Sequence, residues 1–130
     1  MGIQIYSTAL FMGEVVSERN ELGRIVNDGG QRVGRVEIDW GDDANVDHLA
    51  YVYRGEDCVA HVSLDRYMAN VGIITRRENK IGEIRLGGDG TGLVFRGPKQ
   101  LGIIKPTESG VSTRHLILLG GGGAIVLLGI

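Results

Sequence analysis

Apolar, small and polar positions follow one pattern four times along the chain. Each copy has a small residue and then Ile or Val two positions on, a short polar turn, and an apolar–small–any–apolar run. The first elements are residues 23–26, 50–53, 72–75 and 92–95, and the second elements are 33–36, 59–62, 81–84 and 101–104. A repeat of roughly 20 residues is typical of supersecondary units that stack or form a ring.

The pairing register within each copy predicts a β-hairpin. If Val26 faces Val33 across the turn, then Ile25 faces Gly34 and Gly23 faces Val36. The same register places a small residue opposite a large apolar one in the other three copies. Directly opposed residues are the contact unit of a sheet, so this alternation keeps the inward face level. It also lets a neighbouring hairpin approach closely over the small residues.

Two further units are less regular. Residues 12–15 match a second element whose first strand is 3–6, and residues 115–128 form two apolar runs around four glycines. We therefore expect one all-β domain, 1–130, of about six hairpins that form a small closed barrel, a prism-like ring or a short solenoid. The expected units are 1–16, 22–39, 49–65, 71–86, 91–105 and 114–130.

The last unit is uncharged from residue 116 onward. It is shorter than the ~20 apolar residues of a membrane-spanning helix, and consecutive glycines disfavour a helix, so we expect a hairpin and no membrane span. Because both of its faces are apolar, it must be covered on both sides, either at the centre of the fold or in an oligomer. The expected interface residues are Leu116, Ile117, Leu118, Leu119, Ile125, Val126, Leu127 and Leu128.

The amino-acid composition argues against several classes of protein. Of 130 residues, 22 are Gly, which argues against a helical bundle because glycine destabilises helices. A single Cys cannot form an internal disulfide,. The net charge of −2 lacks the basic excess of a nucleic-acid binder,. The N-terminus has no signal-peptide pattern, so we expect the cytoplasm, with assembly into a particle or surface structure left open.

One acidic segment, residues 39–48, departs from the repeat and contains the only Trp. Asp43, Asn45 and Asp47 have the alternating oxygen spacing that begins a calcium loop,. The segment fails the EF-hand pattern, because His48 stands where Gly is needed and Arg54 where the bidentate Glu belongs,. A solvated acidic loop and a site for Ca²⁺ or another divalent cation both fit it.

Three successive turns begin with arginine, at Arg54, Arg76 and Arg96. Hairpins in register bring these side chains to one rim, where guanidinium groups bind an anion or an acidic partner. Alternatively, they keep the hairpin ends soluble. Cys58 occupies a solvent-facing slot, and His61 shares its slot with charged residues of other copies, so neither indicates a catalytic site.

The regular repeat favours a non-enzymatic structural or protein-interaction module that associates with itself or another protein. A module that binds a carbohydrate, an anion or a divalent cation through its turns and the 39–48 segment is the alternative. The third possibility is a metal-dependent enzyme that uses Asp42, Asp43, Asp47 and His48. We rank it last because a cluster of carboxylates alone is weak evidence for a catalytic site.

Overall fold

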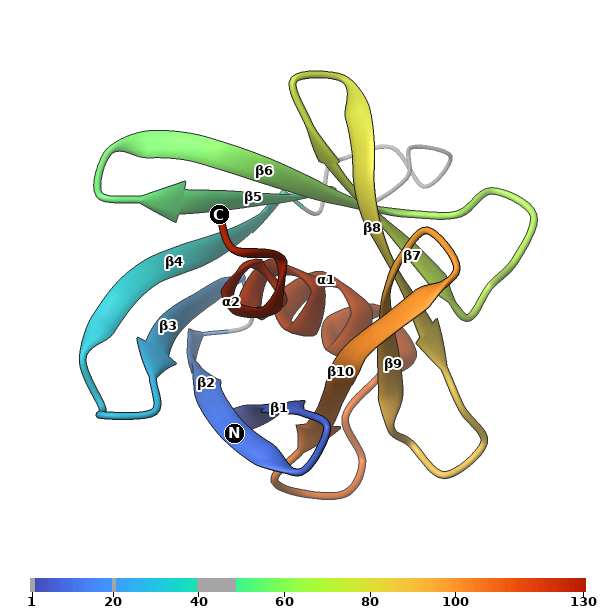
Figure 1. The fold of residues 1–130 in the computed structure, drawn as a ribbon, viewed down its shortest axis with the longest axis horizontal. Coiled ribbons are helices and arrows are strands. Elements are labelled where there is room, and N and C mark those ends of the chain that lie inside the picture. Colours follow the sequence, from blue (N-terminus) through green and yellow to red (C-terminus); the bar gives the residue numbers. More distant parts are fainter. Residues whose placement is uncertain (1, 20, 40–48) are drawn as a thin grey trace.

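The computed structural model describes residues 2–19, 21–39 and 49–130,. Ten antiparallel strands pair in sequence order, and β1 closes onto β10 to complete a barrel, as Figure 1 shows. The strands are β1 (Gly2–Ser7), β2 (Leu10–Arg19), β3 (Leu22–Asn27), β4 (Arg32–Asp39), β5 (Leu49–Arg54), β6 (Asp57–Leu64), β7 (Val71–Arg76), β8 (Asn79–Leu86), β9 (Gly92–Arg96) and β10 (Lys99–Pro106). Of the architectures expected from the sequence, the closed barrel is confirmed.

The expected pairing of small with large residues is also confirmed. Ile25 lies opposite Gly34, and Gly23 lies opposite Val36; the three later hairpins repeat these pairs. Nearer the turn the register shifts, so that Val26 lies opposite Arg32 and not opposite Val33 as expected. Every hairpin has such an irregularity close to its turn. A bulge adds a residue to one strand and bends it.

Glycines on the second strands allow neighbouring hairpins to pack closely. A Cβ atom added to Gly34 would lie 2.6 Å from the carbonyl oxygen of Tyr53 in the next hairpin. A Cβ atom on Gly102 would overlap the carbonyl oxygen of Tyr6, and one on Gly13 would overlap that of Val26. These side-chain-free positions explain how five hairpins form one continuous sheet.

The expected sixth hairpin is wrong. In place of a hairpin over 114–130, the chain forms two helices, α1 (Thr113–Gly123) and α2 (Ile125–Leu128), which lie inside the barrel (Figure 1). Ser112 is the N-cap of α1, and its side chain accepts a hydrogen bond from the backbone N–H of His115 at 3.1 Å. The barrel wall thus has five hairpins, and the segment expected to form the sixth hairpin forms the helices inside it.

The glycine run explains how a helix fits into this lumen. All four glycines of residues 120–123 are buried. A Cβ atom on Gly121 would lie 2.7 Å from Val62 Cγ1, and one on Gly122 would overlap Val36 Cγ2. The backbone of α1 therefore packs directly against the barrel wall. Burial of this surface outweighs the low helix propensity of glycine, as tertiary context commonly does.

After a polar first turn of Thr113, Arg114 and His115, the part of α1 that precedes the glycines is apolar on all sides, as expected for a helix segment buried all round. Ile117, Leu118 and Leu119 are fully buried, and they pack with inward-facing residues such as Ile5 and Ile84 in one hydrophobic core. The chain enters the lumen at the end of the barrel where connections link one hairpin to the next. α2 ends at the opposite end of the barrel, where the five hairpin turns lie. We call the end with the connections the connection end and the end with the hairpin turns the tip end.

No helix among the described residues is both long and apolar enough to cross a membrane.

Candidate functional site

The end of α2 lies at the tip end, surrounded by partly buried apolar side chains. One comes from the second strand of each hairpin, and others come from the end of the helix. They are Met12, Val33, Val59, Ile81, Leu101, Val126, Leu127 and Ile130. Beside the helix end is a pocket of about 320 Å³, which we call the mouth pocket; its lining is Asn27, Val33, Arg54, Ile125, Val126, Gly129 and Ile130.

Two of the three predicted anion-binding arginines contact the end of the helix. Arg54 donates a hydrogen bond to the carbonyl oxygen of Ile130, and Arg96 donates one to that of Leu128 at 2.6 Å. Leu128 is the last residue of α2, and the last carbonyl groups of a helix lack intrahelical partners and carry partial negative charge, so the cation of Arg96 is favourable there. The contact of Arg54 is with the chain two residues beyond the helix. Arg76 lines a different groove. Anion binding by these three arginines stays a prediction, and the helix end gives two of them a structural role.

The two ends of the barrel carry opposite net charge. The described tip end (7–10, 27–32, 54–57, 76–80 and 96–99) has seven basic and four acidic residues, a net charge of +3. The described connection end (18–19, 21–22, 39, 64–71, 86–91 and 105–114) has four basic and six acidic residues, a net charge of −2. A field of one sign at each end attracts the opposite sign and orients an encounter.

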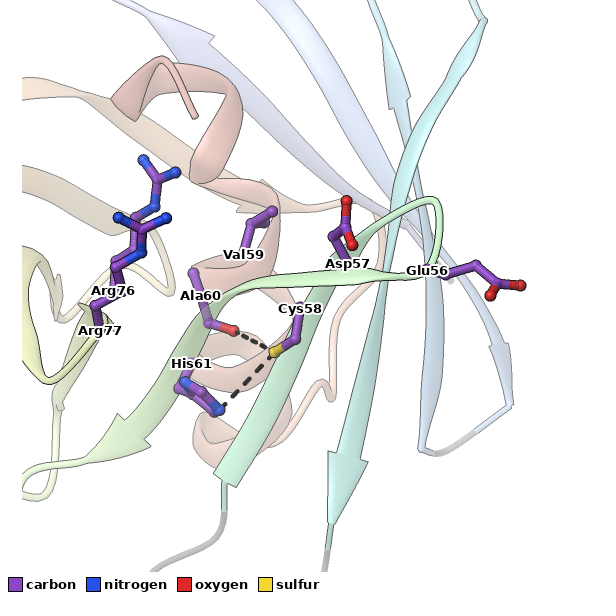
Figure 2. Close-up of a pocket in the computed structure, with 8 residues that line it drawn as sticks. All are labelled: Glu56, Asp57, Cys58, Val59, Ala60, His61, Arg76 and Arg77. Atoms are coloured by element: carbon purple, nitrogen blue, oxygen red, sulfur yellow. Dashed lines mark hydrogen bonds between the residues drawn. The ribbon is translucent and has the colours of Figure 1, made fainter.

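A groove of about 440 Å³ separates the tips of the β5–β6 and β7–β8 hairpins. Figure 2 shows Arg76 and Arg77 side by side on one wall, with Ala60 and Val59 of β6 across from them. The lining of this groove thus has two basic residues, Arg76 and Arg77, and two acidic residues, Glu56 and Asp57.

The groove also contains a thiol–imidazole pair that sequence reasoning missed. Cys58 is exposed, as expected. Its Sγ atom lies 3.8 Å from His61 Nε2, and its thiol donates to the carbonyl oxygen of Ala60 at 3.6 Å (Figure 2). Residues three apart on a regular strand point to opposite faces. The register shift in this hairpin brings both side chains to one face, and such a bulge has no clear signature in the sequence.

The His61 ring is oriented by an edge-to-face contact with Tyr51, with ring centroids 5.0 Å apart. A Cys–His pair acts as a nucleophile when the imidazole takes the thiol proton and a third group orients the imidazole. Within the described part of the chain, the ring contact with Tyr51 is what orients His61.

A buried carboxylate stabilises the hairpin on the far side of the groove. Glu83 is 8% exposed, and it accepts hydrogen bonds from Lys80 Nζ at 2.9 Å and from Arg85 Nε. Burial raises the pKa of the Glu83 carboxyl. The hydrogen bonds and positive charges of Lys80 and Arg85 outweigh burial and hold the pKa below its usual range.

This arrangement predicts a pH-dependent contribution to stability. Glu83→Gln is expected to lower the free energy of unfolding at neutral pH by about 1.5–3 kcal/mol, the range for hydrogen bonds to charged groups. Because the pKa is lower in the folded state, the ionised carboxyl stabilises the fold fully above pH 4.5, its unfolded value, and this stabilisation is lost as pH falls through the folded pKa. Urea denaturation of both proteins across this range measures the effect.

The exposed Glu78→Gln in the same hairpin is the matched control, for which we expect little change,. A wild-type-to-Glu83→Gln difference that does not shrink in acid would contradict this account.

The other predicted site residues divide into two groups. Asp43, Asn45 and Asp47, the expected metal ligands, lie outside the described residues, as do Asp42 and His48. In the part of the chain that is described, no three His, Cys, Asp or Glu side chains gather to hold a metal ion. Of the eight expected interface residues, six are buried inside the barrel, and Val126 and Leu127 are partly exposed at the tip end.

Comparison with models of known protein families, with curated proteins and with solved structures finds no match to this chain.

Proposed function

We propose that this chain is a non-enzymatic structural module that self-associates head to tail, with the tip end of one copy on the connection end of the next. The observation that carries this proposal is the opposite net charge of the two ends, +3 and −2 among the described residues. Partly exposed apolar residues at the tip end, including Val126 and Leu127, add surface that gains from burial,.

Because α1 occupies the lumen, a binding function falls to the outer surface of the barrel. The lumen of a barrel of about eight strands is either filled by side chains or holds one small ligand, and larger barrels leave a channel. Here the lumen holds α1, packed so tightly that its glycines admit no Cβ atom without displacing the wall. Recognition therefore falls to the outer surface and the two ends. Contacts between unlike ends are heterologous, so they propagate into open chains unless the rotation closes a ring.

Sedimentation velocity of the whole chain over a broad concentration range tests this proposal. We expect the mean mass to rise with concentration in about 0.1 M salt and to fall towards the monomer in about 1 M salt, because the Debye length shrinks from about 10 Å to about 3 Å. A monomer at all concentrations would overturn the proposal. So would a species that stops at the dimer, since that indicates an interface between like ends.

Charge reversal at each end supplies matched variants. Arg76→Glu with Arg77→Glu makes the tip end acidic without touching the two arginines that bind the helix end, and we expect association to weaken roughly tenfold or more. Arg19→Glu with Arg114→Glu reverses the same number of charges at the connection end, where we expect association to persist or strengthen. Equal effects of the two pairs would contradict an interface between opposite charges.

A further inference from the structure

Two adjacent apolar side chains project from the connection end. Tyr67 is 93% exposed and Met68 is 53% exposed, and both lie in the link between β6 and β7. Single exposed apolar residues are normal on protein surfaces. Here two of them, an aromatic and a thioether side chain, follow one another in a single link, and we call this pair the knob.

Hydrogen bonds hold the knob in a defined conformation. Asp65 Oδ1 accepts from the backbone N–H of Tyr67 at 2.8 Å and from that of Met68 at 3.0 Å. The N–H of Val71 donates to the carbonyl oxygen of Met68 at 3.1 Å, and the N–H of Asp65 donates to that of Val71 at 2.9 Å. A loop ordered before binding loses less conformational entropy when it binds.

The opposite end of the barrel offers a complementary hollow. The mouth pocket of about 320 Å³ has Val33, Ile125, Val126 and Ile130 in its lining. Arg54 fixes one side by its hydrogen bond to the carbonyl oxygen of Ile130. Asn27 and Arg54 add polar groups to the pocket wall, which suits a tyrosine, because its ring is apolar and its hydroxyl forms hydrogen bonds.

We propose that the knob of one copy inserts into the mouth pocket of a second copy. This inference rests on the proposed head-to-tail association and names the side chains that form the contact. The knob lies at the acidic end and the pocket at the basic end, so the charges of the two surfaces favour this encounter over knob to knob or pocket to pocket,. An apolar projection that fits a pocket elsewhere on the same surface produces a heterologous contact.

Two variants, each lacking one half of the contact, test the proposal. Tyr67→Ser with Met68→Ser removes the knob, and Val126→Gln makes the pocket polar while keeping the net charge. Sedimentation velocity of each variant alone is expected to give a monomer, with association weakened at least roughly tenfold. An equimolar mixture is expected to give a one-to-one dimer that grows no further, because one knob and one pocket remain and they lie on different copies.

Controls keep the outcomes distinct. Ile103→Ser changes a half-buried apolar side chain on β10, between the inward-facing Gly102 and Ile104 and away from both ends of the barrel, and it should leave association unchanged. Circular dichroism and urea denaturation establish that each variant is folded; if Val126→Gln is not, Val33→Gln on the barrel wall replaces it.

Each remaining outcome decides the question. Folded variants that associate as the wild type does would overturn the knob-and-pocket contact and leave head-to-tail association standing. A mixture that stays monomeric would also overturn the contact. A wild-type chain that never associates would overturn both proposals.

Discussion

A chain shortened to residues 1–111 is expected not to form the barrel. Removing α1 and α2 takes away six large buried side chains, those of Leu116, Ile117, Leu118, Leu119, Ile125 and Leu128. At about 1.5–3 kcal/mol for each, the loss is on the order of 10 kcal/mol, as large as the whole stability of a typical domain. The inward side chains of the wall would then line a lumen open to water.

Far-ultraviolet circular dichroism with urea denaturation measures this effect. The shortened chain should show no cooperative transition, and a milder change at the same place should give a graded result. Ile117→Ala is expected to cost about 2–5 kcal/mol and Ile117→Val about 0.5–1.5 kcal/mol, because Ile117 is fully buried in the lumen,. A shortened chain with the wild-type transition would show that the strands close without the helix.

Gly122→Ala is expected to destabilise the protein, although alanine is the best helix former and glycine among the worst. In an exposed helix this change gains about 1 kcal/mol. Here the added Cβ atom would overlap Val36 Cγ2 and lie 2.8 Å from Val36 Cγ1. Valine is stiff about χ1 and cannot turn away. We therefore expect a net loss of about 1–3 kcal/mol, the usual cost of overpacking a core.

Urea denaturation of three further variants separates this clash from other effects. They are Gly88→Ala, Val36→Ala and the double variant that combines Val36→Ala with Gly122→Ala. Gly88→Ala is the control, because a Cβ atom on Gly88 meets nothing within 4 Å, so its effect should lie within about 0.5 kcal/mol. Val36→Ala removes both γ-methyl groups, and Gly122→Ala should cost less in that background than in the wild type. A Gly122→Ala protein more stable than the wild type would show that the wall yields to the helix.

The hairpins could be predicted because their signals are local. Alternating side-chain faces and a short polar turn set the partner of Ile25 as Gly34, and the same arithmetic held in three more hairpins. It failed one residue nearer the turn, at Val26, because a bulge depends on strain within the folded sheet and leaves little trace in composition,. The Cys58–His61 pair was missed for the same reason.

The candidate surface was predictable only in part. Arginines at three equivalent turns indicated a basic rim, and the apolar end of the chain indicated a surface that must be covered. The structure adds that Arg54 and Arg96 bind the carbonyl groups at the helix end. That contact joins residues 76 and 32 positions apart, which no local pattern can reveal.

The sequence by itself determined a wall of repeated β-hairpins, because strand alternation and turn chemistry act between near neighbours. It left open whether these hairpins form a closed barrel, a ring or a solenoid, which the tertiary structure decided. The sequence did not determine whether residues 113–128 form a helix or a pair of strands. An apolar run broken by four glycines suits a strand pair by propensity, and with no polar face it carries no helical period to detect. The closed barrel decides the secondary structure of these residues. A lumen lined with Ile and Val must be occupied by an apolar segment that satisfies its own backbone hydrogen bonds. A helix supplies both, and glycine makes it narrow enough to fit,.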